Sequence, residues 1–499
     1  MPTPWTEILV AIDVGTSGAR ACAFDLDGAR QLEVRRAYRT ESPAPGWAEQ
    51  APRAWRSAAL AALAGLVRGL GPRRRVSAIG LTGQCPSVCL VDARGAPLGP
   101  GLIYRDNRAS AEAAAIRDRF GDVAIHARTG HLPTAFHIAP KLLWLKAHEP
   151  ETFARASRAL QPRDLVAHAL TGEMATDGTH AAATLVFDLR RGAWAGDLQE
   201  VLGLRPELFP PVRPSWEALG GLAPTPARQA GLLPGVPIIL GGADSQACAL
   251  GAGVVRPGLV SEMAGSSTCL NATVREQLSI PQVSHYPHVI PGWLTTETGI
   301  NTTGAAIAWM ADLLYAPRGR SASAADYARL DREAARVPPG AGGVLALPTL
   351  ADGERTDPDL RAAFTGLSLR HDRAVLARAM LEGVAFAIRD QLALLEAGGV
   401  RVTELRTSGG DTRLATWNRI KADVIGVPVV TVPGDAAVGG VAMLAGLGAG
   451  IYRDAADAIR RCVRLDDALE PDPVAYAHYQ TAFEAWRTLA ASAAARRSD

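Results

Sequence analysis

The stretch that decides the fold is Ile8-Leu-Val-Ala-Ile-Asp-Val-Gly-Thr-Ser17. Its apolar start is typical of a buried strand, its Gly-Thr-Ser end is typical of a tight turn, and residues 19–24 resume a strand-like pattern. A similar order returns about 250 residues later, where Leu259-Val-Ser-Glu-Met263 leads into Ala264-Gly-Ser-Ser-Thr268 and a strand-like run over residues 269–274. Such a repeat predicts two related halves.

The chain around the first turn mixes strand-like and helical patterns. Strand-like runs joined by short turns precede a segment with apolar residues at helical spacing, residues 53–69, and further strand-like runs follow it. This order predicts a mixed α/β sheet and not a regular alternation of parallel strands and helices. Together with the repeat, it predicts two domains, residues 1–252 and residues 253–499.

The composition excludes several classes of function. The 499 residues carry 52 Lys and Arg against 50 Asp and Glu, and a net charge of +2 gives no electrostatic case for nucleic acid or an anionic membrane. No apolar run has the length and the low content of glycine and charged residues that a membrane-spanning helix needs. The N-terminus also lacks the pattern of a signal peptide. The six cysteines are scattered without metal-binding spacing. We therefore expect a cytoplasmic protein with no nucleic-acid or membrane partner.

The first turn has the residue types that bind a nucleotide phosphate. Gly15 lets the backbone approach oxygen atoms, and Thr16 and Ser17 add hydroxyl and N–H donors. Asp13 can hold Mg²⁺, usually through water, and Arg20 can neutralise phosphate charge. An ordinary hairpin turn is the alternative when this motif is considered alone.

Two later glycine-rich turns favour the phosphate interpretation. The turn at residues 265–268 repeats the first one, and two such turns predict a clamp on a polyphosphate. Thr407-Ser-Gly-Gly410 follows a short strand and precedes a helical pattern over residues 413–426. Glycines between a strand and a helix allow a phosphate or adenosine to approach the helix N-terminus closely. A turn needed only for packing is the alternative for Gly409 and Gly410.

Asp244 is the predicted catalytic residue. It follows an apolar strand, Val236-Pro-Ile-Ile-Leu240, and a Gly-Gly-Ala turn, at the start of a helical pattern. One alternative is a helix N-cap, a position that Asp fills well. The other is a general base that takes the proton of a substrate hydroxyl as it attacks the γ-phosphate of ATP. Because that proton moves late in a loose transition state, an ordinary carboxylate aligned on the hydroxyl is sufficient.

These motifs, taken in order from Ile8 to about Tyr452, resemble those of the FGGY carbohydrate kinases, relatives of xylulokinase, ribulokinase and glycerol kinase. The closest likeness is to xylulokinase, with ribulokinase-like features at residues 265–269. The resemblance implies a duplicated actin-like and ribonuclease-H-like fold around a central cleft, with ATP and Mg²⁺ as cofactors and a sugar or polyol as substrate. The stretches that carry it are residues 12–20, 80–84, 139–145, 170–177, 241–246, 353–358, 364–367, 379–386 and 417–423.

The resemblance also implies a role for each matching residue. Asp13 is similar to the metal-site aspartate of the family, Thr16 to its γ-phosphate contact and Asp244 to its catalytic base. The predicted nucleotide-binding residues are Gly15, Thr16, Ser17, Arg20, Gly265, Ser266, Gly304, Gly409 and Gly410. The residues at or beside positions that line the sugar pocket of the family are Gln84, Cys85, Tyr104, Asp106, Phe136, Ser245 and Gln246.

The departures from the family pattern fall mainly in the sugar pocket. After Gln84, xylulokinases continue Met-His-Gly and glycerol kinase has an Arg-Glu pair, whereas this chain has Cys85-Pro-Ser87. Loss of those groups removes specific hydroxyl contacts, so the pocket should discriminate differently among sugars. Asp411 stands where a small residue is common, and it either caps the following helix or weakens ATP binding.

The predicted function is ATP-dependent phosphorylation of a small sugar, a ketopentose such as xylulose. A kinase of another ketose or polyol, such as ribulose or an erythritol-like compound, is one alternative. An actin-like ATPase that binds a protein partner is another, and a family member that binds sugar without catalysis is the third. The family also leads us to expect a homodimer.

Overall fold

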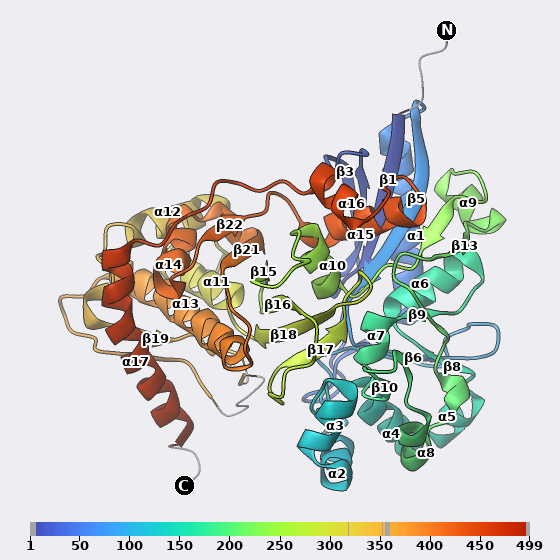
Figure 1. The fold of residues 1–499 in the computed structure, drawn as a ribbon, viewed down its shortest axis with the longest axis horizontal. Helices are drawn as coiled ribbons and strands as arrows, with labels where there is room; N and C mark the ends of the chain where they lie inside the picture. Colours follow the sequence, from blue (N-terminus) through green and yellow to red (C-terminus); the bar gives the residue numbers. More distant parts are fainter. Residues whose placement is uncertain (1–5, 318, 352, 355–359, 496–499) are drawn as a thin grey trace. The chain divides into compact units, whose positions relative to one another are not determined.

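The computed structural model describes residues 6–317, 319–351, 353–354 and 360–495 (Figure 1). The described chain forms two compact units. The first comprises Met1–Gly253, Arg275–Thr295 and Ala437–Val463, and the second comprises Val254–Val274, Thr296–Ala436 and Arg464–Asp499. The chain therefore leaves the first unit after Gly253, and two later segments belong to it again. The division into residues 1–252 and 253–499 stays a prediction.

A six-stranded mixed sheet forms the centre of the first unit. In the order β13-β14-β5-β1-β2-β3, its strands are Ala218–Gly221, Pro237–Ile239, Arg74–Gly83, Thr6–Val14, Gly18–Phe24 and Arg30–Ala37. The neighbours of β5, which are β1 and β14, run parallel to it, whereas β2 runs antiparallel to both β1 and β3. Residues 8–14 of β1 are all buried, as expected for a central strand covered on both faces.

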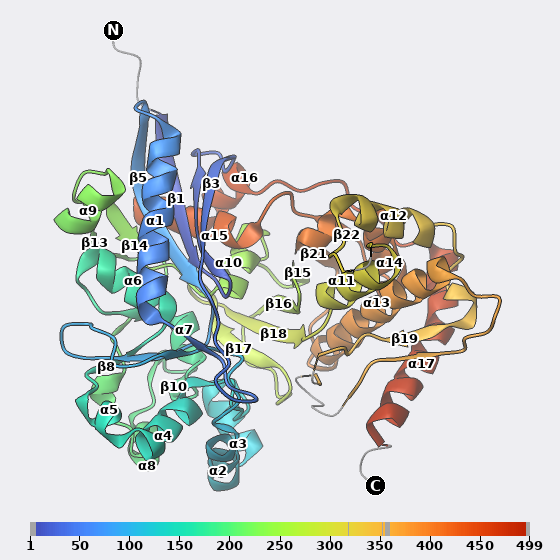
Figure 2. The same cartoon turned by 180° about the vertical axis from the view of Figure 1, so that it is seen from behind.

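Helices cover both faces of this sheet. On one face lies α1 (Pro52–Leu70) (Figure 2). This helix begins with proline at its first turn and buries Trp55, Leu63 and Leu66. On the other face lie α10 (Asp244–Gly251) and α15 (Ala436–Gly448) (Figure 1). A Cβ atom at Gly440 of α15 would lie 1.9 Å from the carbonyl oxygen of Ala247 in α10, so glycine lets the two helices cross closely.

A helix-rich region lies between β5 and β14 in sequence. Its core includes Leu142, Phe153, Leu185 and Phe209. Its helices are α2 (Ser110–Phe120), α3 (Asp122–Thr129), α4 (Ile138–His148), α5 (Pro150–Arg155), α6 (Pro162–Thr171), α7 (Gly178–Ala182), α8 (Gly196–Leu202), η1 (Pro206–Leu208) and α9 (Pro224–Ala230). The short strands of this region are β6 (Cys89–Val91), β7 (Gly101–Leu102), β8 (Arg158–Leu160), β9 (Thr176–Asp177), β10 (Phe187–Asp188), β11 (Ala193–Trp194) and β12 (Val212–Arg213). The earlier strand β4 (Glu49–Gln50), which precedes α1, pairs with β7.

The second unit repeats the strand pattern of the first. Its neighbouring strands are β18 (Leu294–Ile300), β16 (Thr268–Val274), β15 (Leu259–Ala264), β21 (Glu404–Gly409) and β22 (Val429–Thr431). The pair β15 and β16 is antiparallel, and β15, β21 and β22 are parallel, as are β1, β5 and β14. This common topology confirms the predicted duplicated α/β fold.

The remaining elements complete the chain. They are β17 (Ser284–Pro287), α11 (Gly304–Leu314), α12 (Ala324–Ala334), η2 (Ala341–Gly343), β19 (Leu345–Leu347), β20 (Ala363–Thr365), α13 (Arg373–Ala397), η3 (Gly410–Arg413), α14 (Ala415–Ile425), α16 (Ala455–Cys462) and α17 (Pro473–Ala495). In the parts of the chain that the structure describes, no helix is both long enough and apolar enough to cross a bilayer.

The start of the helix that follows β21 differs from the sequence prediction. The helix predicted over residues 413–426 begins at Ala415, because the 3₁₀ turn Gly410–Arg413 comes between β21 and α14. The N-cap of α14 is Leu414. The side chain of Asp411 lies outside the described part of the structure, so its two predicted roles stay alternatives. Most of the family-like stretch at residues 353–358 also lies outside it.

Candidate active site

The turn after β1 is held by side chains that bind its carbonyl groups. The Gly15 carbonyl accepts hydrogen bonds from the Tyr38 hydroxyl and from Gln84 Nε2, the latter at 3.4 Å. The Thr16 carbonyl accepts one from Gln50 Nε2 at 2.7 Å. A Cβ atom at Gly15 would meet its nearest neighbour only at 3.5 Å, an ordinary contact. Packing therefore does not explain this glycine, whereas the predicted close approach of a phosphate to the backbone would explain it.

The predicted metal ligand Asp13 and the predicted phosphate ligand Arg20 form an ion pair. They face each other across β1 and β2, and Arg20 Nε lies 2.7 Å from Asp13 Oδ2. In the described residues, no group of three or more His, Cys, Asp or Glu could hold a metal ion. Mg²⁺ usually keeps several waters and uses one or two carboxylates together with substrate phosphates. Asp13 therefore suits a magnesium ion shared with a nucleotide.

Gln84 is oriented by Gln50, a residue that the sequence analysis missed. Gln84 Nε2 donates to Gln50 Oε1 at 2.8 Å, and Trp55 Nε1 donates to the same oxygen at 2.7 Å. Gln84 Oε1 is buried and has no hydrogen-bond partner among the residues that the structure describes. A buried acceptor without a partner is costly, so this oxygen suits a hydroxyl of a bound substrate.

Aromatic side chains connect the first turn with the predicted sugar pocket. The Thr16 hydroxyl donates to the Tyr104 hydroxyl at 3.4 Å, and the Tyr104 and Phe136 rings meet edge to face at 6.2 Å. The Phe136 carbonyl accepts a hydrogen bond from Lys141 Nζ at 2.8 Å. Burial lowers the pKa of Lys141 to about 7. Cys85 is partly buried and packs against a hydrophobic cluster that consists of Ala181, Ala182, Ala183, Phe187 and Tyr286.

Asp106 makes contacts of a structural kind. Its two carboxylate oxygens accept hydrogen bonds from Arg108 at 2.7 and 2.8 Å, and Oδ2 also accepts one from the Ala48 N–H at 2.6 Å. Arg108 also pairs with Glu49 at 2.7 Å and lies over the Trp47 ring at 3.6 Å. These contacts support a role in holding the loop around Asp106, and a direct contact with sugar stays a prediction.

Asp244 lies at the N-terminus of α10, and its neighbours Ser245 and Gln246 contact each other. The N-cap is Ala243, so Asp244 is the first helical residue and does not occupy the N-cap position. Asp244 Oδ1 accepts a hydrogen bond from the Ser245 N–H at 2.8 Å, and Gln246 Nε2 donates to Ser245 Oγ at 3.2 Å. The positive end of the helix dipole favours the ionised carboxylate that a general base requires.

The loops of the first unit that carry the predicted site follow parallel strands. The Gly15 turn follows β1, Gln84 and Cys85 follow β5, and Asp244 follows β14. Ligands of open α/β sheets bind beyond the carboxyl ends of parallel strands. This topology therefore places the three loops at one edge of the sheet.

The second unit brings its own predicted nucleotide residues together. The Gly304 N–H, at the start of α11, donates to the Gly265 carbonyl at 3.1 Å, and the Ala305 N–H donates to the Ser266 carbonyl at 3.1 Å. Gly409 pairs in register with Ala264, the residue before this turn. These residues therefore lie at the carboxyl ends of β15 and β21.

The glycines near the ends of β15 and β21 are present for different physical reasons. Gly409 has φ +124°, and a Cβ atom there would lie 2.0 Å from the Ala264 carbonyl, so the fold itself requires glycine. At Gly410, a Cβ atom would meet nothing within 4 Å, and at Gly265 it would meet only Ser267 O, at 3.4 Å. The structure thus leaves open space beside Gly265 and Gly410, so packing does not require glycine at either position. Open space next to the backbone is what a bound nucleotide would need.

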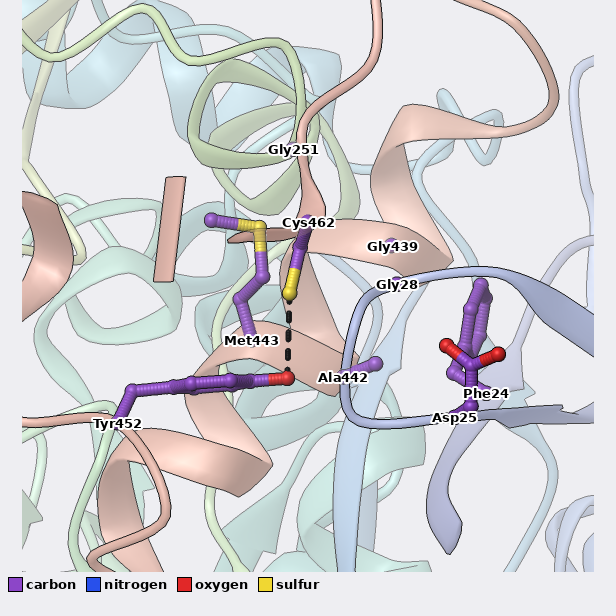
Figure 3. A pocket seen from close by; sticks show the side chains of 9 residues that line it. All are labelled: Phe24, Asp25, Gly28, Gly251, Gly439, Ala442, Met443, Tyr452 and Cys462. Carbon is purple, nitrogen blue, oxygen red and sulfur yellow. Dashed lines mark hydrogen bonds between the residues drawn. The ribbon is translucent and has the colours of Figure 1, made fainter. Parts of the chain in front are cut away.

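A small cavity lies elsewhere in the first unit (Figure 3). Its volume is about 30 Å³, room for a water molecule and too small for a sugar or nucleotide. Tyr452 and Cys462 lie on one side of it, with the Cys462 sulfur 3.1 Å from the Tyr452 hydroxyl, and Gly28 lies in the turn between β2 and β3. It contains none of the predicted site residues.

Comparison with known proteins identifies the family. Residues 8–251 match the N-terminal domain and residues 261–449 the C-terminal domain of the FGGY family of carbohydrate kinases. An autoinducer-2 kinase of Salmonella choleraesuis (strain SC-B67) is 32% identical over 500 residues, which cover 96% of this chain and 93% of that protein. A xylulose kinase of Bacillus subtilis (strain 168) is 26% identical over 488 residues, which cover 96% of each chain.

A solved structure agrees with this assignment. The crystal structure of xylulose kinase from Rhodospirillum rubrum matches with a TM-score of 0.89 at 33% identity and covers 97% of this chain and 98% of that one. The predicted family and the predicted two-domain actin-like fold are confirmed, and a sugar kinase is favoured over an actin-like ATPase with a protein partner. The chain belongs to the FGGY family of carbohydrate kinases and is an ATP-dependent sugar kinase.

Proposed function

We propose that this chain transfers the γ-phosphate of ATP to a hydroxyl of a small open-chain sugar, a ketopentose such as xylulose. The observation that carries the proposal is the position of Asp244. It is the first residue of α10 and lies just beyond the carboxyl end of β14. A carboxylate there can accept the proton of an attacking hydroxyl. The likeness to xylulose kinases in sequence and structure supports the choice of sugar.

The residues of the first unit have separate tasks in this proposal. Asp244 accepts the proton of the sugar hydroxyl, and Gln84 Oε1 accepts a hydrogen bond from another hydroxyl and so orients the sugar. The backbone of the Gly15 turn and the Thr16 hydroxyl contact the γ-phosphate. Bound Mg²⁺, with Asp13 as a ligand, would neutralise charge on the phosphates of ATP.

Autoinducer-2 is a second candidate substrate. The relative that is 32% identical over nearly its whole length is named as an autoinducer-2 kinase. In addition, Cys85-Pro-Ser87 departs from the xylulokinase pattern, so the hydroxyl contacts of the pocket differ from those of xylulokinases. We also propose that the protein works in the cytoplasm, where ATP is available, and that it forms a homodimer.

A panel of acceptors tests the proposal. ADP release is measured with Mg²⁺ and ATP, without acceptor and with xylulose, ribulose, erythritol or autoinducer-2. We expect the highest kcat/KM with xylulose, and a higher value with autoinducer-2 would support the second candidate. ADP release that no acceptor stimulates would contradict the proposal.

A variant tests the base. Asp244→Asn should lower kcat by about 10³-fold or more while leaving ATP binding unchanged, because it removes the proton acceptor and not a nucleotide contact. The matched control is Asp118→Asn, which changes an exposed carboxylate on α2. A wild-type rate in Asp244→Asn would contradict the role of this residue.

A further inference from the structure

Three buried side chains fix the main chain that leads into Asp244. The Thr82 hydroxyl donates to the Gly242 carbonyl at 2.7 Å, and Arg163 Nη1 donates to the Leu240 carbonyl. The Thr179 hydroxyl accepts the Ala243 N–H at 2.8 Å. The last of these contacts involves the residue directly before Asp244.

The orientation of the Thr179 hydroxyl is set by Asp177. Thr179 Oγ1 donates to Asp177 Oδ2 at 2.7 Å, which uses its one hydrogen and leaves its lone pairs for the Ala243 N–H. The same carboxylate oxygen accepts the Thr179 N–H at 2.9 Å and the Ser215 hydroxyl at 3.0 Å. Both Thr179 and Asp177 are buried, at 1% and 0% exposure.

Asp177 remains ionised although it is buried. Arg163 Nη2 and His180 Nδ1 each lie 2.7 Å from Asp177 Oδ1. Burial acts to raise the pKa of the Asp177 carboxyl, but the Arg163 guanidinium and the hydrogen bonds from His180 and Thr179 hold it below its usual range. An ionised acceptor makes a stronger hydrogen bond than a neutral one, so Thr179 is held firmly.

The glycine at position 242 permits this arrangement. A Cβ atom there would lie 3.4 Å from Thr179 Oγ1 and 2.7 Å from Val289 Cγ1. A larger residue would therefore clash with Val289, while its Cβ atom would make only an ordinary contact with Thr179. Glycine thus lets the loop between β14 and α10 lie against Val289 and beside the threonine.

We propose that Thr179, oriented by Asp177, is a positioning residue that aligns the Asp244 carboxylate on the sugar hydroxyl. The inference rests on the proposed role of Asp244 as the base. Neither Thr179 nor Asp177 needs to touch the sugar, since both act through the peptide between Gly242 and Ala243, which directly precedes Asp244. A displacement of about 1 Å in an aligned catalytic group can cost about 10²-fold in rate.

Two substitutions at Thr179 separate positioning from packing. Thr179→Val keeps the shape but removes the hydroxyl, and we expect kcat to fall at least about tenfold while KM for ATP stays within about twofold. Thr179→Ser keeps the hydroxyl and should restore kcat to within about threefold of the wild type. Thr82→Val breaks a different hydrogen bond of the same loop and should also lower kcat with little effect on KM, which keeps the test available if Thr179→Val does not fold.

The matched control is Thr184→Val. Thr184 is 4% exposed and its hydroxyl bonds the Ala181 carbonyl at 2.6 Å, but that bond does not involve the loop before Asp244. We expect this variant to lose stability without a comparable loss of kcat. An equal loss of kcat in both variants would show a general effect of buried hydroxyls and would overturn the inference.

A double-mutant cycle shows whether Thr179 acts through Asp244. In an Asp244→Asn background, Thr179→Val should change the residual rate by less than about twofold, because there is no carboxylate left to align. The same fold-loss in both backgrounds, or an unchanged kcat in Thr179→Val alone, would overturn the positioning role. A wild-type rate in Asp244→Asn would instead overturn the proposed base, and the inference with it, so the two failures are distinguishable.

Discussion

The hydroxyl groups of Thr16 and Tyr104 lie 3.4 Å apart, although the two residues are separated by 88 positions in the chain. Thr16 belongs to the turn that suits a phosphate, and Tyr104 contacts Phe136 in the predicted sugar pocket. The two predicted subsites of the first unit therefore adjoin, as phosphoryl transfer to a sugar hydroxyl requires.

Removing the Tyr104 hydroxyl should weaken substrate binding. Tyr104→Phe leaves the ring in place but removes a hydroxyl that we predict to line the sugar pocket, so we expect KM for the sugar to rise about 5–10-fold, with a smaller change in kcat. Steady-state kinetics at saturating ATP measure this change. Tyr476→Phe, on α17 in the second unit, is the control, and equal KM values in both variants would contradict the prediction.

Asp13 should set the magnesium requirement. In Asp13→Asn the partner of Arg20 loses its charge, and a neutral amide is a weaker ligand for Mg²⁺ than a carboxylate. We expect the Mg²⁺ concentration for half-maximal activity to rise about tenfold or more, with KM for the sugar unchanged. A magnesium titration of activity checks it, with Asp118→Asn as control; an unchanged magnesium dependence would rule out Asp13 as the ligand.

The adjacent glycines Gly409, which ends β21, and Gly410, which follows it, should respond differently to substitution by alanine. Gly409→Ala forces a Cβ atom against the Ala264 carbonyl at φ +124°, so thermal denaturation should show a Tm lower by about 5 °C or more. Gly410→Ala has room for the methyl group, so its Tm should stay near that of the wild type while KM for ATP rises. Unchanged KM for ATP in Gly410→Ala would mean that this turn does not contact the nucleotide.

Lys141 should make stability depend on pH. Burial lowers its pKa in the folded protein to about 7 from an ordinary value of 10.5, so between these values the unfolded chain binds a proton that the folded protein does not. The free energy of unfolding should therefore increase with pH across this window, by up to about 1.4 kcal/mol per pH unit.

Denaturant unfolding at several pH values tests this sign. The slope between about pH 7.5 and 9 should be smaller in Lys141→Met than in the wild type. Lys146→Met, which changes an exposed lysine on the same helix, should keep the wild-type slope. A wild-type slope in Lys141→Met would show that another group causes the dependence.

Local patterns in the sequence were sufficient for the elements at the centre of each unit. The turns at Gly15 and Gly265 follow apolar runs, and this combination indicates both the strand and its end without any long-range information. The predicted start of α14 at residue 413 is two residues too early, because Arg413 ends a 3₁₀ turn and local sequence does not separate such a turn from the helix that follows it.

The residues that support the site could not be found in this way. Gln50 contacts Gln84 across 34 positions, and Thr179 contacts Ala243 across 64, so neither contact leaves a periodic signal in the sequence. Thr179 also resembles an ordinary helix-start residue, since Asp177 caps α7. Only the folded chain shows that these side chains reach the loops around the predicted base.

The return of residues 437–463 to the first unit has a consequence for how this protein is made. A Cβ atom at Gly80 of β5 would lie 2.6 Å from the Val441 carbonyl of α15, so this late helix closes one face of a sheet whose strands begin at Thr6. A ribosome must synthesise the whole second sheet before that face is covered. Until then the part of this face that α15 covers stays exposed, so we expect an N-terminal fragment that ends before residue 437 to aggregate more readily than the whole chain.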